Sequence, residues 1–282
     1  MSYSFFAFWL STTTTLMPGQ YVQPAEQARW QLQGDAFRCS MQQTVAGLGQ
    51  VSFVIAPDQP LTLILDILKP NLHLQQVTVA GRNADWQPAE RIIADFSHPA
   101  DQITPVQARF IVPAPGLLQH IDLGYWLDFE LRADETAANL ILPSIEGRQA
   151  VTGFRHCVAD MSPLSWEQAR DHQILFDAGQ RTASTEDLRF LEQLVRYLSK
   201  DGSVTRILID GHADDSNGSI ANRLLSQERA DDVAARLIEF GAKTGMIEVR
   251  AHGNRYPVAK TGTGGKELHN RRVLIRLIRK ST

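Results

Sequence analysis

The pattern of hydrophobic and polar residues changes near residue 165. Before that point, apolar residues come in short alternating runs that Pro and Gly interrupt, and helical periodicity is weak. Runs of this kind are typical of strands. We therefore predict a mostly antiparallel β domain over residues 20–165, with a short helix near residues 24–30. The clearest predicted strands are residues 51–55, 61–67, 74–80, 108–112 and 126–131.

Beyond residue 165, strand patterns alternate with long helical patterns. Ser184 opens a capping-box sequence, and leucines follow it at helical spacing. A second helix is predicted over residues 222–240, ended by Gly241. The predicted strands are residues 173–176, 205–210, 246–251 and 272–278. The order βαβαββ predicts helices packed on one mixed sheet over residues 166–282, so the fold class is α+β.

The first 19 residues fit neither domain and stay unassigned. Residues 5–10 form an apolar run that is too short to span a bilayer. No Lys or Arg precedes the run, and no small-x-small site follows it, as a secretory signal normally requires. The segment is either the remnant of a signal peptide with a misplaced start or a sequence foreign to the protein.

Composition narrows the class of protein. The chain has 282 residues, of which 43% are hydrophobic and 21% charged, and this suits two globular domains with their own cores. A net charge of -3 does not favour a nucleic-acid or membrane partner. A basic stretch near the end could still bind nucleic acid or an anionic polymer, or it is a strand whose alternate positions face solvent. We prefer the strand for two of its residues, Arg276 and Arg279.

Cys39 and Cys157 are the only two cysteines. Their spacing lacks the local pairs that a zinc site needs. Two alternatives stay open on the sequence alone. They are unrelated buried thiols, or they form one long-range disulfide, which requires an oxidising compartment.

Several separated motifs of the second domain agree in order and spacing. They are Gly-His-Ala-Asp at residues 211–214, Asn-Arg-Leu-Leu-Ser-Gln-Glu-Arg-Ala at 222–230, Gly253 and Pro257 in a loop, and Asn-Arg-Arg-Val at 270–273. From about Ile174 onward the chain resembles the OmpA-like peptidoglycan-binding domain. The resemblance implies a two-layer α/β sandwich in which Asp214 and Arg229 clamp the diaminopimelate of a peptidoglycan stem peptide.

The chemistry of that ligand agrees with the two residues. The side-chain end of diaminopimelate bears an ammonium and a carboxylate, and Arg can hold a carboxylate bidentately. The other residues that the resemblance brings to the site, to order the pocket or touch the ligand, are Asn222, Asn270 and Arg272. The alternatives are that Asp214 is a turn residue, that Arg229 forms a surface salt bridge with Asp232, and that Arg272 faces solvent from its strand.

The first domain carries a looser resemblance. Its segments are Tyr-Val-Gln-Pro at residues 21–24, Gln-Ala-Arg-Trp-Gln-Leu at 27–32, Gly-Gln-Val-Ser-Phe at 49–53, Trp-Gln-Pro at 86–88 and Phe-Arg-His-Cys at 154–157. They resemble the N-terminal domain of MotY, a family of periplasmic components of polar flagellar motors. The resemblance implies a Cys39–Cys157 disulfide and a ring around the flagellar basal body that helps to retain stator units. We expect no catalysis, no cofactor and no metal.

Other classes of protein fit less well. A wall anchor of another envelope complex fits the second domain equally, so only the first domain discriminates. A wall hydrolase finds no support in the eight scattered histidines, although His212 and His252 end predicted strands and could meet. A nucleic-acid module fits least, because no aromatic residues are interleaved with the basic ones.

Overall fold

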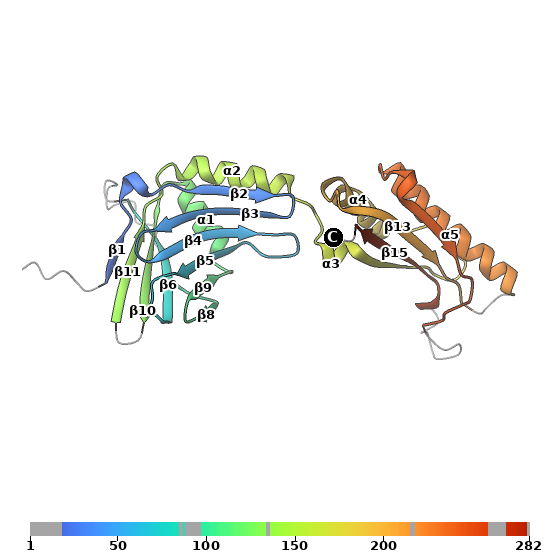
Figure 1. Cartoon of the computed structure of the whole chain (residues 1–282), viewed down its shortest axis with the longest axis horizontal. Coiled ribbons are helices and arrows are strands. Elements are labelled where there is room, and N and C mark those ends of the chain that lie inside the picture. The colour runs from blue at the N-terminus through green and yellow to red at the C-terminus, as the bar shows by residue number, and fades with distance from the viewer. Residues whose placement is uncertain are drawn as a thin grey trace, which may run out of the picture. The chain divides into compact units, whose positions relative to one another are not determined.

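The computed structural model describes residues 19–84, 87, 97–133, 136–214, 218–258 and 269–280. These residues form two compact units (Figure 1). The first unit holds the residues up to Gln33, Ser40–Val54 and Leu61–Arg155, and the second holds Gly34–Cys39, Ile55–Pro60 and the chain from His156 onward. The apolar run at residues 5–10, and Trp86 and Pro88 of the looser resemblance, lie outside the described residues.

Two sheets make up most of the first unit. The six-stranded sheet has the order β2 (Gln31–Asp35), β3 (Arg38–Val45), β4 (Gly49–Ile55), β5 (Thr62–Ile67), β9 (Gln107–Phe110) and β8 (Gln102–Thr104). The five-stranded sheet has the order β1 (Gln20–Val22), β11 (Thr136–Leu142), β10 (Trp126–Ala133), β6 (Leu74–Arg82) and β7 (His98–Pro99). Most of the registered strand pairs are antiparallel, as predicted, whereas β1 runs parallel to β11.

The core of the first unit follows from the alternation within its strands. Phe53 of β4 lies opposite Leu63 of β5, and both side chains are fully buried. Phe110 of one sheet meets Phe129 of the other edge-on, with ring centroids 6.0 Å apart. Aromatic pairs in this geometry add stability beyond the area they bury, so the contact helps to hold the two sheets together.

Helices of the first unit depart from the predicted pattern. The short helix near residues 24–30 is a 3-10 turn, η1 (Ala25–Gln27), whereas α1 (Ala114–Asp122) and α2 (Gly147–Asp160) were not predicted. The first turn of α1 contains Pro115, and proline is compatible with a helix only there. The buried stripe of α2 consists mainly of small residues, which gives a weak hydrophobic signal. A Cβ at Gly153 would lie 2.4 Å from a methyl carbon of Leu32, so α2 packs closely on β2.

The second unit has the predicted order of strands and long helices, and it adds two short helical elements that the sequence pattern does not predict. It runs α3 (Trp166–Arg170), β12 (Asp171–Leu175), α4 (Thr185–Lys200), β13 (Val204–Gly211), α5 (Ser219–Glu239), η2 (Thr244–Met246), β14 (Ile247–Ala251) and β15 (Arg272–Arg279). The sheet order is β12–β15–β13–β14, with β13 parallel to β14 and antiparallel to β15. The predicted α+β class and the single mixed sheet are confirmed. None of the helices within the described ranges is long and apolar enough to cross a membrane.

Local sequence explains both long helices. Ser184 accepts from the backbone N–H of Asp187, whose side chain accepts in return from the N–H of Ser184, and this capping box fixes the start of α4. Gly241 adopts a φ of +110° just beyond α5, a conformation that glycine takes without strain. Both helices bury apolar side chains, such as Leu194 and Val233, against Ile209 and Ile275 of the sheet.

The disulfide between Cys39 and Cys157 is confirmed, with the two Cα atoms 6.0 Å apart. It closes a loop with a sequence separation of 118 residues, which contains most of the first unit. The bond is closely packed, because a Cβ on Gly34 would lie 2.4 Å from the sulfur of Cys157. An unrelated pair of buried thiols, the other reading of the sequence, is therefore wrong.

Candidate functional site

The loop that follows β13 presents the first predicted site residue, Asp214. Gly211 ends the strand against α5, where a Cβ would lie 2.2 Å from the carbonyl oxygen of Ser226. The next two residues are held by backbone hydrogen bonds, His212 N–H to Arg272 O (2.8 Å) and Ala213 N–H to Gly253 O (2.8 Å). Because the loop is fixed on both sides, the position of Asp214 is determined by the fold.

Asp214 forms an ion pair with Arg271, a residue that was not among the predicted site residues. Nη1 of Arg271 lies 2.8 Å from Oδ2 of Asp214, and the two side chains keep 16% and 10% of their surface exposed. Nε of Arg271 donates to the carbonyl oxygen of Phe176 at 3.0 Å. The pair is thus positioned by the end of β12 and the start of β15, and solvent can reach it. The signal that could have revealed Arg271 is its place beside Arg272, since neighbouring strand residues face opposite sides.

Arg229, the second predicted member of the clamp, is fully buried. Its Nε donates to Gln180 O at 2.8 Å and its Nη2 to Asp177 O at 3.3 Å, and the guanidinium lies 5.1 Å from the ring centroid of Phe176. Nη1 has no hydrogen-bond partner within the described part of the chain. Burial lowers the pKa of Arg229 to about 10, although the negative charge of Asp214 raises it. The guanidinium group therefore still carries its charge at neutral pH.

The alternative interpretation of Arg229, in which it forms a surface salt bridge with Asp232, is wrong. Asp232 instead accepts from the backbone N–H of Ala183 at 2.8 Å and lies 3.7 Å from Arg236. The structure therefore brings Asp214, Arg271 and Arg229 into one group of interacting charges, in which Asp214 and Arg271 keep a small exposed surface and Arg229 keeps none.

The other three predicted site residues are buried. Asn222 is fully buried in the first turns of α5. Oδ1 of Asn270 accepts from the backbone N–H of Val258 at 2.9 Å. Arg272 is buried, which lowers its pKa, and its Nη2 donates to Tyr256 O at 3.2 Å. The alternative in which Arg272 faces solvent is wrong: it lies on the same face of β15 as exposed Arg276, but it is buried and its guanidinium donates to the carbonyl oxygens of Tyr256 and His269.

His212 and His252 do meet at the strand ends. Their rings stack with centroids 4.9 Å apart, and His252 Nε2 lies 2.7 Å from Oδ1 of Asp210. Burial, followed by the nearby charge of Arg272, lowers the pKa of His212 to about 4, so this ring is neutral at pH 7. Oδ2 of Asp210 forms an ion pair with Nη2 of Arg276 at 2.7 Å. The cluster supports the base of the Asp214 loop. Across the described ranges, no group of three or more His, Cys, Asp or Glu side chains could hold a metal ion.

The basic stretch at the chain end is largely paired. Arg279 Nη2 lies 2.8 Å from Asp201, and its guanidinium lies 3.7 Å from the ring centroid of Trp166. Burial raises the pKa of Asp201, but hydrogen bonds from Ser203, Tyr197 and Arg279 together outweigh it and lower the pKa to about 2. Arg276 and Arg279 therefore neutralise buried carboxylates in addition to touching solvent.

Two known families match the chain. The MotY N-terminal domain matches residues 21–163, and the OmpA family matches residues 175–271. The chain is 20% identical over 277 residues to the sodium-type flagellar protein MotY of Vibrio parahaemolyticus, which covers 93% of this chain and 91% of that protein. It is 31% identical over 110 residues to the outer-membrane lipoprotein YfiB of Pseudomonas aeruginosa, covering 39% of this chain and 65% of YfiB.

Solved structures resemble the second part of the chain. The peptidoglycan-associated lipoprotein from Burkholderia pseudomallei is 26% identical, with a TM-score of 0.36, over 38% of this chain and 89% of that one. The C-terminal domain of Helicobacter pylori MotB is 20% identical, with a TM-score of 0.36, over 39% of this chain and 86% of that one.

Proposed function

Because the chain belongs to the MotY N-terminal domain family, we propose that it is a non-enzymatic component of a flagellar motor that works in the periplasm. Its β-rich domain, residues 20–165, binds the flagellar basal body and takes part in a ring around it. Its OmpA-like domain, residues 166–282, binds peptidoglycan. The chain thereby ties the motor to the cell wall and helps to retain stator units against the reaction to their torque.

The extent of the similarity to a known protein supports the role proposed for the first domain. The similarity to the Vibrio protein extends over 93% of this chain, so it includes the β-rich domain as well as the OmpA-like one. The disulfide supports the compartment, since such bonds persist in the periplasm and are rare in the cytosol.

Peptidoglycan binding is supported above all by the partly exposed pair of Asp214 and Arg271 with buried Arg229 beside it. This group offers one carboxylate and two guanidinium groups, which can bind the ammonium and the carboxylate of a zwitterionic ligand. In the proposed complex the ammonium of diaminopimelate binds Asp214, and its carboxylate binds the guanidinium groups. The two ion pairs so formed replace the one between Asp214 and Arg271.

Arg229 contributes a second supporting observation. A buried donor without a partner costs about 1–3 kcal/mol, and Nη1 of Arg229 is such a donor within the described residues. A ligand carboxylate would provide the missing acceptor. Asn222, Asn270 and Arg272 act in this proposal by holding α5 and the loops around the site in place.

Co-sedimentation with isolated sacculi tests the site. Asp214→Ala and Arg271→Ala should each weaken pelleting by at least about tenfold, because losing one partner of a charged hydrogen-bonded pair costs roughly 2–5 kcal/mol. Arg229→Ala should abolish it, and Arg229→Lys, which keeps the charge, serves in case the alanine variant does not fold. Circular dichroism melts establish that each variant is folded.

Matched controls come from the far end of α5. Glu239→Ala and Arg236→Ala remove the same charges from exposed positions that pair with each other at 2.8 Å, and they should pellet as the wild type does. Wild-type pelleting by a folded Asp214→Ala or Arg229 variant would overturn the assignment of the site.

A further inference from the structure

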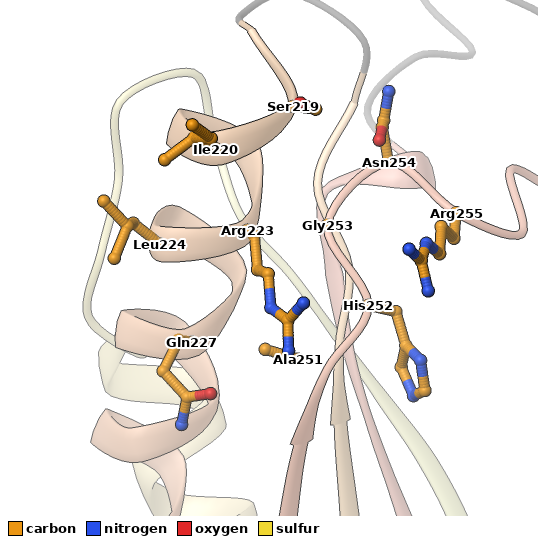
Figure 2. Close-up of a pocket in the computed structure, with 10 residues that line it drawn as sticks. All are labelled: Ser219, Ile220, Arg223, Leu224, Gln227, Ala251, His252, Gly253, Asn254 and Arg255. Carbon is orange, nitrogen blue, oxygen red and sulfur yellow. The ribbon is translucent and has the colours of Figure 1, made fainter.

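A cavity lies beside the N-terminal half of α5, and its lining does not include the Asp214 group. It has a volume of about 410 Å³. One wall is the outward face of α5 from Ser219 to Gln227, and the other is the end of β14 with the loop from Ala251 to Arg255 (Figure 2). We call this cavity the α5–β14 groove. Neither Asp214 nor Arg271 lines it.

The charge of the groove is unbalanced. Arg223 reaches from α5 into the space beside Ala251, and Arg255 extends from the facing loop (Figure 2). Both side chains are exposed, and neither has an ion-pair partner within the described part of the chain. Among the described residues that line the groove, none is Asp or Glu. This contrasts with Arg271, Arg276 and Arg279, each of which is paired with a carboxylate.

The groove also has an apolar rim. Ile220 and Leu224 stand one helical turn apart on α5, and they remain 78% and 61% exposed. A single exposed leucine is ordinary, but two aliphatic side chains beside one cavity make a contiguous apolar surface. Arg223 lies next to Ile220 and Leu224 on the helix, so a ligand in the groove could contact a cation and aliphatic side chains at the same place. Arginine beside exposed apolar side chains is typical of protein-binding surfaces.

We propose that the α5–β14 groove binds a segment of a protein partner that carries carboxylates and aliphatic side chains in alternation. The carboxylates bind Arg223 and Arg255, and the aliphatic side chains cover Ile220 and Leu224. A nucleic acid would use the guanidinium groups but leave the aliphatic side chains exposed. A peptidoglycan stem peptide, rich in charge and poor in apolar bulk, would do the same. The second domain thus holds a partner and the wall at two separate sites.

Fluorescence anisotropy of labelled model peptides with the full chain tests this proposal. The probe is a capped peptide of alternating Leu and Glu, and the comparison peptides replace Glu with Lys or Leu with Ser. We expect saturable binding of the Leu-Glu peptide alone. Arg223→Glu with Arg255→Glu should weaken it by at least about tenfold, since like charges across an interface repel. Leu224→Ser should weaken it too.

Controls separate this groove from the peptidoglycan site. Arg236→Glu, a charge reversal on the same helix outside the groove, and Asp214→Ala should both leave peptide binding unchanged. Because the readout does not involve the wall, it is informative even if the sacculus assay fails. Three results would each overturn the proposal: no saturable binding of the Leu-Glu peptide, undiminished binding by the double arginine variant, or displacement of the peptide by a soluble muropeptide.

Discussion

Loss of the Cys39–Cys157 bond should destabilise the protein, because the bond closes the loop that contains most of the first unit. The bond closes a loop with a separation of 118 residues, which in the chain-entropy relation corresponds to about 5 kcal/mol at 25 °C. A change of 1 kcal/mol moves the melting temperature of a domain of this size by roughly 2–4 °C. We therefore expect the melting temperature of the first unit to fall by roughly 10–20 °C.

Two perturbations separate the closed loop from the packing of its sulfur atoms. Reduction with a phosphine opens the loop and keeps both sulfur atoms, whereas Cys39→Ala with Cys157→Ala also removes a buried sulfur from Cys39. The chain has no other cysteine, so thiol exchange cannot confuse the result. Thermal melts by calorimetry should show the transition of the first unit at a lower temperature, because most of that unit lies inside the loop.

The double variant supplies the control, since its melting curve should not respond to reductant. Alkylation followed by mass spectrometry verifies that the wild-type sample is fully reduced. If fully reduced wild type melts within about 2 °C of the oxidised protein, the entropic reasoning is refuted. A double variant that still loses stability in reductant would show that the effect does not come from this bond.

Three further changes test the packing and electrostatics of the second unit. Gly211→Ala should lower the free energy of unfolding by about 1–3 kcal/mol in urea melts, because its Cβ would lie 2.2 Å from the carbonyl oxygen of Ser226; a wild-type midpoint would contradict this close approach. His212 has a pKa of about 4 in the fold against an ordinary 6.5, so the unfolded chain gains its proton first and stability should fall as the pH drops from 6.5 to 4. His212→Gln should flatten that slope, and an unchanged slope would rule out this histidine as its source. Asp201 has its pKa lowered from 3.8 to about 2, so it stabilises the fold above pH 4 and loses this effect between pH 4 and 2. Asp201→Asn should therefore cost stability at pH 7 but not near pH 2, and an equal loss at both would contradict the ion pair as its cause.

Much of the fold could be predicted from the sequence because the second unit keeps clean periodicities. The capping box at Ser184 and the glycine after α5 mark helix ends by local chemistry, which does not depend on the rest of the fold. The helices of the first unit lack such signals. In α1 the prolines suggest a loop, and in α2 the buried face is made of Gly147, Ala150, Val151 and Phe154, mostly small residues whose burial depends on the sheet beneath.

The candidate site was predictable in its location but not in its pairing. The motifs place Asp214 and Arg229 near one another, yet sequence does not reveal that Arg229 is fully buried with two backbone carbonyl partners. Nor does it reveal which of two adjacent arginines faces Asp214. Alternation sends Arg271 and Arg272 to opposite sides, but the choice between them depends on the register of β15 against β12 and β13.

In the proposed function, this chain joins the flagellar motor to the cell wall. The most direct measurement is whether the protein co-purifies with hook–basal bodies isolated from its native host. We expect the protein to be found on these basal bodies and also to pellet with sacculi. A protein that pellets with sacculi but is absent from basal bodies would contradict the motor role and leave a wall anchor of another envelope complex.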